Sequence, residues 1–290
     1  KFVPACNLCY GWKNGQAGIT HYLEFAGLYA DMYIPSMRTS CDFAICVKGV
    51  DVFSEMMFDW VVCRPSAVIG VVSPVGDGGS VATLLKAVED EYFLALSGSM
   101  KRRKLSGSVS GNMSLYTVPK AETQDRSLQF KFHTQWQYLF SDSWQWTLRL
   151  TERFRTWGQM FRTDLRSDLA WKSPRLSLTY RFNALHCNGL SWLTYLEGGL
   201  RYGKWNYYLK QGFFMVDDWD DRIYAYERDV PGAYNVPAFY GRGMWTSLMT
   251  SWKPSRWCSL YFRAGLTTYP FMQEKKPGKA ELRFQSVFDF

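Results

Sequence analysis

The feature that most constrains this chain is the alternation of apolar and polar residues in its last segment, residues 280–290. One face carries Ala280, Leu282, Phe284, Ser286, Phe288 and Phe290, and the other carries Glu281, Arg283, Gln285, Val287 and Asp289. Successive side chains of a β-strand point to opposite faces of a sheet. The segment therefore predicts a strand with one apolar face and one largely charged face.

The same alternation recurs upstream. It is strong at residues 128–138, 144–154, 161–171 and 175–182, and weaker at 191–202, 205–215, 244–252 and 257–268. The first part of the chain offers plausible strands at residues 17–33, 50–62, 67–72 and 81–88. Each long run is close to the roughly 9 to 11 residues that a tilted strand needs to cross a bilayer.

Residues 100–112 are polar and basic, and they predict a solvated loop, with a nucleic-acid signal as the weaker alternative. Connections supply a second pattern, because bacterial barrels keep periplasmic turns short and extracellular loops longer. We expect short inside turns at 140–143, 172–174, 203–206 and 253–256, and outside loops at 156–160, 184–190, 217–243 and 270–279.

Composition agrees with strands that face lipid. Aromatic residues make up 18% of the chain, with 13 Trp and 18 Tyr, which fits the aromatic girdles of a membrane barrel. The mean hydropathy of −0.24 is unremarkable, because a barrel strand shows lipid only every second residue. At about 20 residues per strand with its connection, residues 1–290 predict one all-β domain, a transmembrane antiparallel up-and-down β-barrel of roughly 14 strands, range 12 to 16.

Charge and cysteines exclude other classes. The formal net charge of +8 does not indicate nucleic-acid binding, because the basic residues sit singly within alternating strands. Cys6 and Cys9 have no second Cys or His pair at metal-ligand spacing, so a structural role is favoured. Seven cysteines imply at most a disulfide or two. The start at Lys1 without a signal segment is expected of a mature or trimmed protein.

Two resemblances add to this interpretation. The C-terminal segment, with Leu282, Phe284, Phe288 and Phe290, resembles the terminal strand of outer-membrane β-barrels, which implies recognition by the barrel-assembly machinery. Segments 222–227 and 237–241, and more loosely 64–67, resemble the C-terminal barrel of Bacteroidota outer-membrane proteins labelled by a helix-hairpin-helix domain. That resemblance implies a bacterial outer-membrane location and brings no catalytic residues with it.

Candidate chemistry is sparse. A hydrolase would need a nucleophile with a base, and only His21, His133 and His186 are available. A lumen hydrogen-bonding role is favoured for His133. The acidic run at 217–221 could hold Ca²⁺, but it lacks the closing Glu of a calcium loop, so a solvated turn is favoured. We expect no catalytic residue, no metal and no cofactor.

Inward charges are the clearest functional candidates. The predicted lumen-lining residues are Lys131, His133, Arg149, Arg153, Arg162, Asp164, Arg166, Asp168, Arg175 and Arg181. An Arg-rich wall would favour anions in an open pore. In a closed lumen the same arginines would pair with the aspartates across strands, and this second interpretation is favoured.

The loop 217–243 carries residues typical of interfaces, and it could fold into the mouth or form a docking surface. The predicted loop and partner-docking residues are Arg222, Tyr224, Tyr226, Glu227, Tyr234, Phe239 and Tyr240. Three functions follow, in order of preference. They are a non-enzymatic subunit or platform of an envelope complex for export or barrel assembly, a porin-like channel for anionic or sugar solutes, and an envelope hydrolase. Expected partners are outer-membrane lipid and lipopolysaccharide, the barrel-assembly machinery and other envelope proteins, with no nucleic acid.

Overall fold

A computed structural model describes residues 5–25, 35–59, 63–88, 91–118, 126–272 and 277–288. The chain forms two compact units, which are described separately. The N-terminal unit comprises residues 1–134 and 153–160, and the C-terminal unit comprises residues 135–152 and 161–290. The main sheet has 17 strands, and β15 and β16 form a separate two-stranded sheet. Within the described ranges, no helix is long and apolar enough to span a membrane.

The N-terminal unit is a run of antiparallel hairpins. Its strands are β1 (Ala5–Trp12), β2 (Gly15–Phe25), β3 (Pro35–Val47), β4 (Val50–Asp59), β5 (Arg64–Val75), β6 (Gly79–Val88), β7 (Glu91–Arg102) and β8 (Leu105–Thr117). Each strand pairs with the next in the chain. Between β3 and β4, Lys48 and Gly49 both have positive φ, the geometry of a two-residue hairpin turn whose twist matches the flanking strands.

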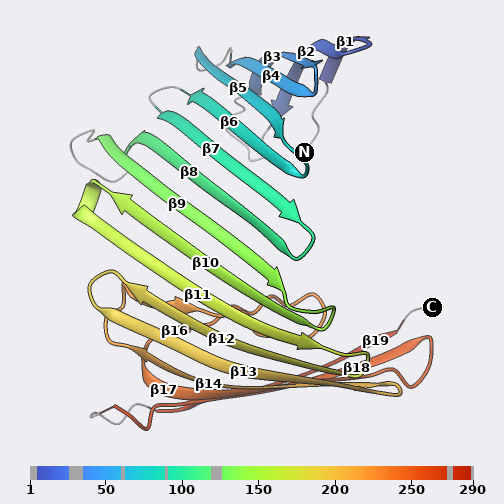
Figure 1. Cartoon of the computed structure of the whole chain (residues 1–290), viewed down its shortest axis with the longest axis vertical. Helices are drawn as coiled ribbons and strands as arrows, with labels where there is room; N and C mark the ends of the chain where they lie inside the picture. Colours follow the sequence, from blue (N-terminus) through green and yellow to red (C-terminus); the bar gives the residue numbers. More distant parts are fainter. Residues whose placement is uncertain are drawn as a thin grey trace. The chain divides into compact units, whose positions relative to one another are not determined.

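The remaining strands follow the same plan. They are β9 (Arg126–Leu139), β10 (Trp144–Arg155), β11 (Met160–Lys172), β12 (Leu176–His186), β13 (Leu190–Tyr202), β14 (Trp205–Val216), β15 (Ile223–Tyr224), β16 (Ala238–Phe239), β17 (Gly241–Trp252), β18 (Cys258–Thr268) and β19 (Lys279–Phe288), with a 3-10 turn η1 (Trp157–Gln159) before β11. Residues of β9 and β10 fall in both units. From β11 to β14 the strands lie side by side in chain order (Figure 1).

The all-β, antiparallel, up-and-down prediction is confirmed, but the strand number is wrong. The main sheet has 17 strands, above the predicted range of 12 to 16. The reason is that connections in the first half are far shorter than assumed, for example residues 48–49 and 103–104. The described pairings do not include one between β1 and β19, so the closure of the barrel stays a prediction.

Two predicted loops are strand instead. Residues 100–112 are not a solvated loop, because β7 and β8 run through them and turn only at Arg103 and Lys104. The expected loop 184–190 shrinks to residues 187–189, as short as the turn 173–175 on the other side of β12. Of the expected outside loops, only 217–240 and 269–278 are clearly longer than the inside turns. The predicted alternation of short and long connections therefore does not extend to the other strands. Two other predicted strands extend beyond the described residues. The strand predicted at 17–33 corresponds to β2, which is described as far as Phe25, and the strand predicted at 50–62 corresponds to β4, which is described as far as Asp59.

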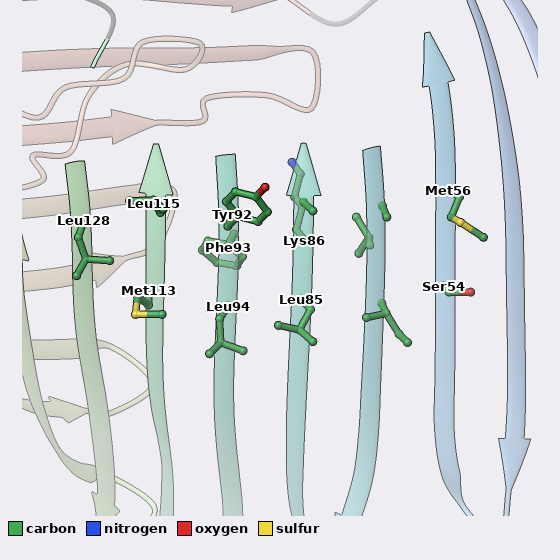
Figure 2. Close-up of a pocket in the computed structure, with 14 residues that line it drawn as sticks. Ser54, Met56, Leu85, Lys86, Tyr92, Phe93, Leu94, Met113, Leu115 and Leu128 are labelled. Atoms are coloured by element: carbon green, nitrogen blue, oxygen red, sulfur yellow. The ribbon is translucent and has the colours of Figure 1, made fainter. Parts of the chain in front are cut away.

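One face of each unit is apolar and exposed. In the N-terminal unit, Ile69, Leu85, Leu94 and Met113 stand opposite one another across β5 to β8 and form one exposed row. Figure 2 shows the side chains of β4 to β9 that line an apolar pocket over this row. Soluble monomers rarely expose contiguous apolar surfaces larger than about a few hundred Å². We call this the outward face, and the opposite one the inward face.

The outward face of the C-terminal unit is similar. Exposed residues on it include Leu178, Tyr180, Leu196, Leu209, Phe213, Phe262, Leu282 and Phe284. Aromatic pairs gather where the short turns lie. Trp205, which begins β14, stacks on Trp252, which ends β17, with ring centroids 5.0 Å apart. Trp144 and Trp171 lie 6.4 Å apart near the turn that follows β11. Aromatic belts of this kind mark the edge of the apolar band in membrane barrels.

Candidate functional site

The inward face of β11 and β12 carries the predicted charged wall. Asp168 stands directly opposite Arg181 in the β11–β12 register. Its carboxylate accepts hydrogen bonds from Arg181 Nε and from Arg166 Nε, the latter at 2.7 Å. All three side chains are partly buried. The expectation that aspartates in this wall neutralise neighbouring arginines is therefore confirmed for Asp168.

Other arginines of the wall hold uncharged groups. Arg149 of β10 donates two hydrogen bonds, of 3.0 and 2.7 Å, to the side-chain oxygen of Gln135 on β9. Arg162 of β11 donates to the backbone oxygens of Asp220 and Arg222 at 2.8 and 3.2 Å. Arg162 therefore lies on the inward face and also binds the backbone of the connection between β14 and β17.

Not every predicted lumen residue joins this wall. Lys131 and His133 lie in β9, Arg153 in β10 and Asp164 in β11, all partly buried. Arg175 does not belong to the lumen wall, because it lies exposed in the turn 173–175 rather than in a strand. Its backbone oxygen accepts a hydrogen bond from the amide of Arg201 at 2.7 Å. The alternation extends one residue too far at this position, because the chain turns before the strand begins.

The connection between β14 and β17, residues 217–240, folds onto the inward face of its own unit; we call it the inward loop. Its Ile223, Ala225 and Phe239 are buried in an apolar cluster with strand residues. The strand members of that cluster are Leu185, Leu193, Tyr195, Phe214, Val216 and Trp245. Phe239 lies 4.3 Å from Trp245, centroid to centroid. Burial of these side chains stabilises the loop against the wall by roughly 1.5 to 3 kcal/mol for each large one.

A single buried carboxylate, that of Asp221, anchors the first part of the inward loop. Asp221 is fully buried and accepts hydrogen bonds from the amides of Asn188 and Gly189, the latter at 2.7 Å. These amides belong to the connection between β12 and β13. A long-range contact, with no signature in the local sequence, therefore holds residues 187–189 in a tight turn.

Two charged clusters fix the rest of the loop to the strands. In the first, Glu197 of β13 pairs with Lys210 of β14 and with Arg228 of the loop, each at 3.0 Å. Lys210 also donates to the backbone oxygen of Tyr226 at 2.8 Å. Lys210 is almost fully buried, so each of these contacts offsets part of the cost of taking its charge out of water.

The second cluster centres on Arg263 of β18. Arg263 donates hydrogen bonds to Glu227 of the loop and, at 2.9 Å, to Glu281 of β19. Asp229 of the loop accepts from Arg283 of β19 at 2.6 Å. The side chains of Arg263, Glu227 and Asp229 are all nearly completely buried, so water screens the charges between them only weakly.

These anchors correct part of the predicted docking surface. Glu227 and Phe239 are only 5% and 4% exposed and cannot offer their side chains to another protein. Tyr224, Tyr226 and Tyr234 are exposed, and Arg222 and Tyr240 are intermediate. Sequence reasoning missed Glu197, Lys210 and Arg263, which hold the inward loop to the strands. Their signal was present, since each is a charged residue alternating with apolar neighbours in the weaker strands.

The acidic run of the loop is used for anchoring. Asp217 accepts two hydrogen bonds from Arg242, both 2.7 Å long, and these hold the pKa of Asp217 below its usual value. Asp221 is occupied by backbone amides, and Asp218 accepts from the amide of Asp220. In the part of the chain that the structure describes, no group of three or more His, Cys, Asp or Glu side chains is placed to hold a metal ion.

The predicted assembly signal lies on the outward face. Leu282, Phe284 and Phe288 are all exposed on β19, while Phe290 falls outside the described residues. His133 lies in β9, and its lumen hydrogen-bonding role stays a prediction; His186 ends β12 in an exposed position. His21 lies in β2.

No protein-family model matches the sequence, and no curated protein matches it either. Among solved structures, the siderophore receptor PirA from Acinetobacter baumannii is similar with a TM-score of 0.49 and 6% identity, over 98% of this chain and 70% of that one. A mutant of the Rh. blastica porin is similar with a TM-score of 0.40 and 9% identity, over the whole of both chains. A bacterial polysaccharide outer membrane secretin is similar with a TM-score of 0.38 and 8% identity, over 88% of this chain and 91% of that one.

Proposed function

We propose that this chain is a bacterial outer-membrane β-barrel that conducts small hydrophilic solutes, with a preference for anions. The observation that carries the membrane placement is the exposed apolar outward face of both units. Bilayer hydrocarbon is the surrounding that removes this surface from water without another protein. The stacked aromatic residues near the short turns support the same placement.

The inward face supports conduction. Its strands bear charged and small polar side chains, such as the serines at positions 80, 97, 99, 108 and 110 on β6 to β8. Ser80 and Ser99 stand opposite each other and share a hydrogen bond of 2.8 Å. Side chains this small do not fill the space above a sheet. In the predicted barrel they would leave room for water.

The arginine excess supports the anion preference. On β10 to β12 the inward charges include Arg149, Arg153, Arg162, Arg166 and Arg181 against Asp164 and Asp168. Arg149 bonds the neutral Gln135, and Arg153 Nε has no hydrogen-bond partner among the described residues. Positive charge in a narrow aqueous passage raises the local concentration of anions.

The inward loop would narrow this passage. It lies on the inward face of its own unit and is anchored by buried charge pairs, which supports a fixed constriction over a free extracellular arm. The same packing weighs against the platform function, because two of its seven predicted docking residues are buried. Exposure of Tyr234 at 85% still favours a subunit role as the second candidate.

Planar-bilayer recordings of the purified full chain test the proposal. We expect ohmic conductance steps and a reversal potential in a salt gradient that reports anion selectivity. Arg149→Glu is expected to lower the anion-to-cation permeability ratio several-fold. The matched control is Arg175→Glu, the same charge change in the exposed turn outside the wall, which is expected to leave the ratio unchanged. An inserted protein without conductance would exclude the channel and favour the subunit role.

A further inference from the structure

The inward loop presents a second face that its anchoring does not use. From residue 221 to 227 the side chains alternate, with Ile223 and Ala225 buried against the wall. Tyr224 and Tyr226 point the other way and are 52% and 51% exposed. In extended chain, alternate residues share a face about 6.6 Å apart. Two aromatic rings are thereby displayed side by side, away from the strands.

Contacts extend these two rings into a longer series, the aromatic row, which consists of Trp219, Arg222, Tyr224, Tyr226 and Tyr234. The Arg222 guanidinium lies 4.8 Å from the centre of the Trp219 ring and 5.8 Å from that of Tyr224. The rings of Tyr226 and Tyr234 lie 6.2 Å apart. Trp219 is 57% exposed. Contacts thus join Trp219, Arg222 and Tyr224 into one group and Tyr226 and Tyr234 into a second, and the two groups meet at the neighbouring positions 224 and 226 of the extended chain.

The aromatic row is held rigidly from behind. Arg222 donates hydrogen bonds to the Tyr224 hydroxyl at 2.7 Å and to the backbone oxygen of Trp219 at 2.9 Å. Arg162 bonds the backbone oxygen of Arg222, and Lys210 bonds that of Tyr226. A surface whose backbone is fixed before a ligand arrives loses little conformational freedom on binding, which favours affinity.

The chemistry of the row selects the kind of ligand. Exposed aromatic faces bind flat apolar surfaces, and the Tyr hydroxyls and the Arg222 guanidinium bind oxygens at the rim of such a surface. A sugar ring offers both, with C–H groups on its faces and hydroxyl groups at its edge. Nucleic acid would also stack, but the exposed carboxylate of Asp220, 3.9 Å from Arg222, opposes phosphate binding.

We infer that the aromatic row is a binding site for linear oligosaccharides, with sugar rings stacked on Tyr224, Tyr226 and the neighbouring rings. This inference deepens the proposed function and rests on it in one respect: in the predicted barrel the row would line the solute path. A series of equivalent rings lets an extended sugar chain move by small steps, each new stacking contact replacing the one lost. Transport of such chains would then be guided rather than purely diffusive.

Isothermal titration calorimetry of the full chain in detergent tests the inference without requiring conduction. The probes are three linear hexasaccharides, namely maltohexaose, cellohexaose and chitohexaose. We expect at least one to bind with a Kd below about 1 mM. Tyr224→Ala with Tyr226→Ala is expected to weaken that binding about tenfold or more, and Tyr224→Phe with Tyr226→Phe by less, because the rings remain.

The matched control is Tyr180→Ala, which removes an exposed ring from the outward face of β12 and is expected to leave the Kd unchanged. Binding that is lost equally in this control would overturn the inference. The inference would also be overturned if none of the three hexasaccharides bound. This holds equally if the loop is found to bind a protein partner instead. Sugar binding without conductance would keep the inference and exclude the channel. Conductance without sugar binding would do the reverse.

Discussion

Arg263 of β18 donates a hydrogen bond to Glu227 of the inward loop, and neither side chain is more than 6% exposed. The two residues lie far apart in sequence and belong to different elements. A buried pair of this kind costs desolvation on both sides and holds only while both partners are present. The pair therefore stabilises the inward loop in its position against the strands. Removing one partner leaves an uncompensated charge inside the unit.

Replacing Arg263 is expected to release the loop. Arg263→Ala leaves Glu227 with the hydrogen bond that the Asn235 side chain donates to it, and should lower the free energy of unfolding by about 3 kcal/mol or more. Urea titration in detergent measures this loss. The matched control is Arg242→Ala, which breaks an exposed pair with Asp217 and should lower the free energy of unfolding far less, because water and salt screen exposed pairs. Equal losses in the two variants would show that burial of the Arg263 pair has no special effect.

Gly212 is expected to tolerate no side chain. A Cβ built at Gly212 would lie 2.3 Å from the ring of Trp245, which stands opposite it in the β14–β17 register. Gly212→Ala should therefore displace Trp245 from the apolar cluster and destabilise the C-terminal unit by about 1 to 3 kcal/mol. Gly198→Ala is the control, because a Cβ there meets nothing within 4 Å. Thermal unfolding followed by near-UV circular dichroism reports both the stability and the packing of Trp245.

Introducing an arginine at two neighbouring positions of β19 should have very different effects on stability. Phe284 lies on the outward face and Gln285 on the inward face. Phe284→Arg places a cation toward lipid and should cost up to about 2 to 4 kcal/mol, depending on its depth in the bilayer. Gln285→Arg should be nearly neutral. Folding yield and urea stability in lipid vesicles compare the two variants. Similar costs would contradict the lipid-facing assignment of the outward face, as would a chain that stays monodisperse in buffer without detergent.

The Asp217–Arg242 pair predicts a pH effect of known sign. The hydrogen bonds from Arg242 lower the pKa of Asp217 in the folded chain. A lowered pKa stabilises the fold above the unfolded value of about 3.9, and this contribution disappears as pH falls through the lower folded value. The stability difference between the native chain and Asp217→Asn should therefore be small but positive at pH 6 and vanish toward pH 2. Thermal unfolding at both pH values measures it, and Arg242→Gln should reproduce the same loss.

Much of the fold was readable in the sequence. Alternation of period two placed Leu282 and Phe284 on one face and Glu281 and Arg283 on the other, and β19 has this arrangement. It also placed Asp168 among arginines that it pairs with. Such predictions succeed because the direction of a side chain in a strand depends only on its position along the chain. The prediction of a loop at residues 100–112 was wrong, because serine and glycine occur in loops and also in strands that face water.

What only the tertiary structure decided is the course of the inward loop. Its sequence is compatible with an extracellular arm or with a segment folded inward, because aromatic and charged residues suit both. Contacts with distant residues settle the matter: Asp221 bonds the turn at 188–189, Phe239 packs on Trp245, and Glu227 meets Arg263. Each partner lies on another strand, and no local pattern records which strand a loop residue will reach. The sequence by itself therefore determined the strands and their two faces, while long-range packing and buried charge pairs placed the loop on the inward face.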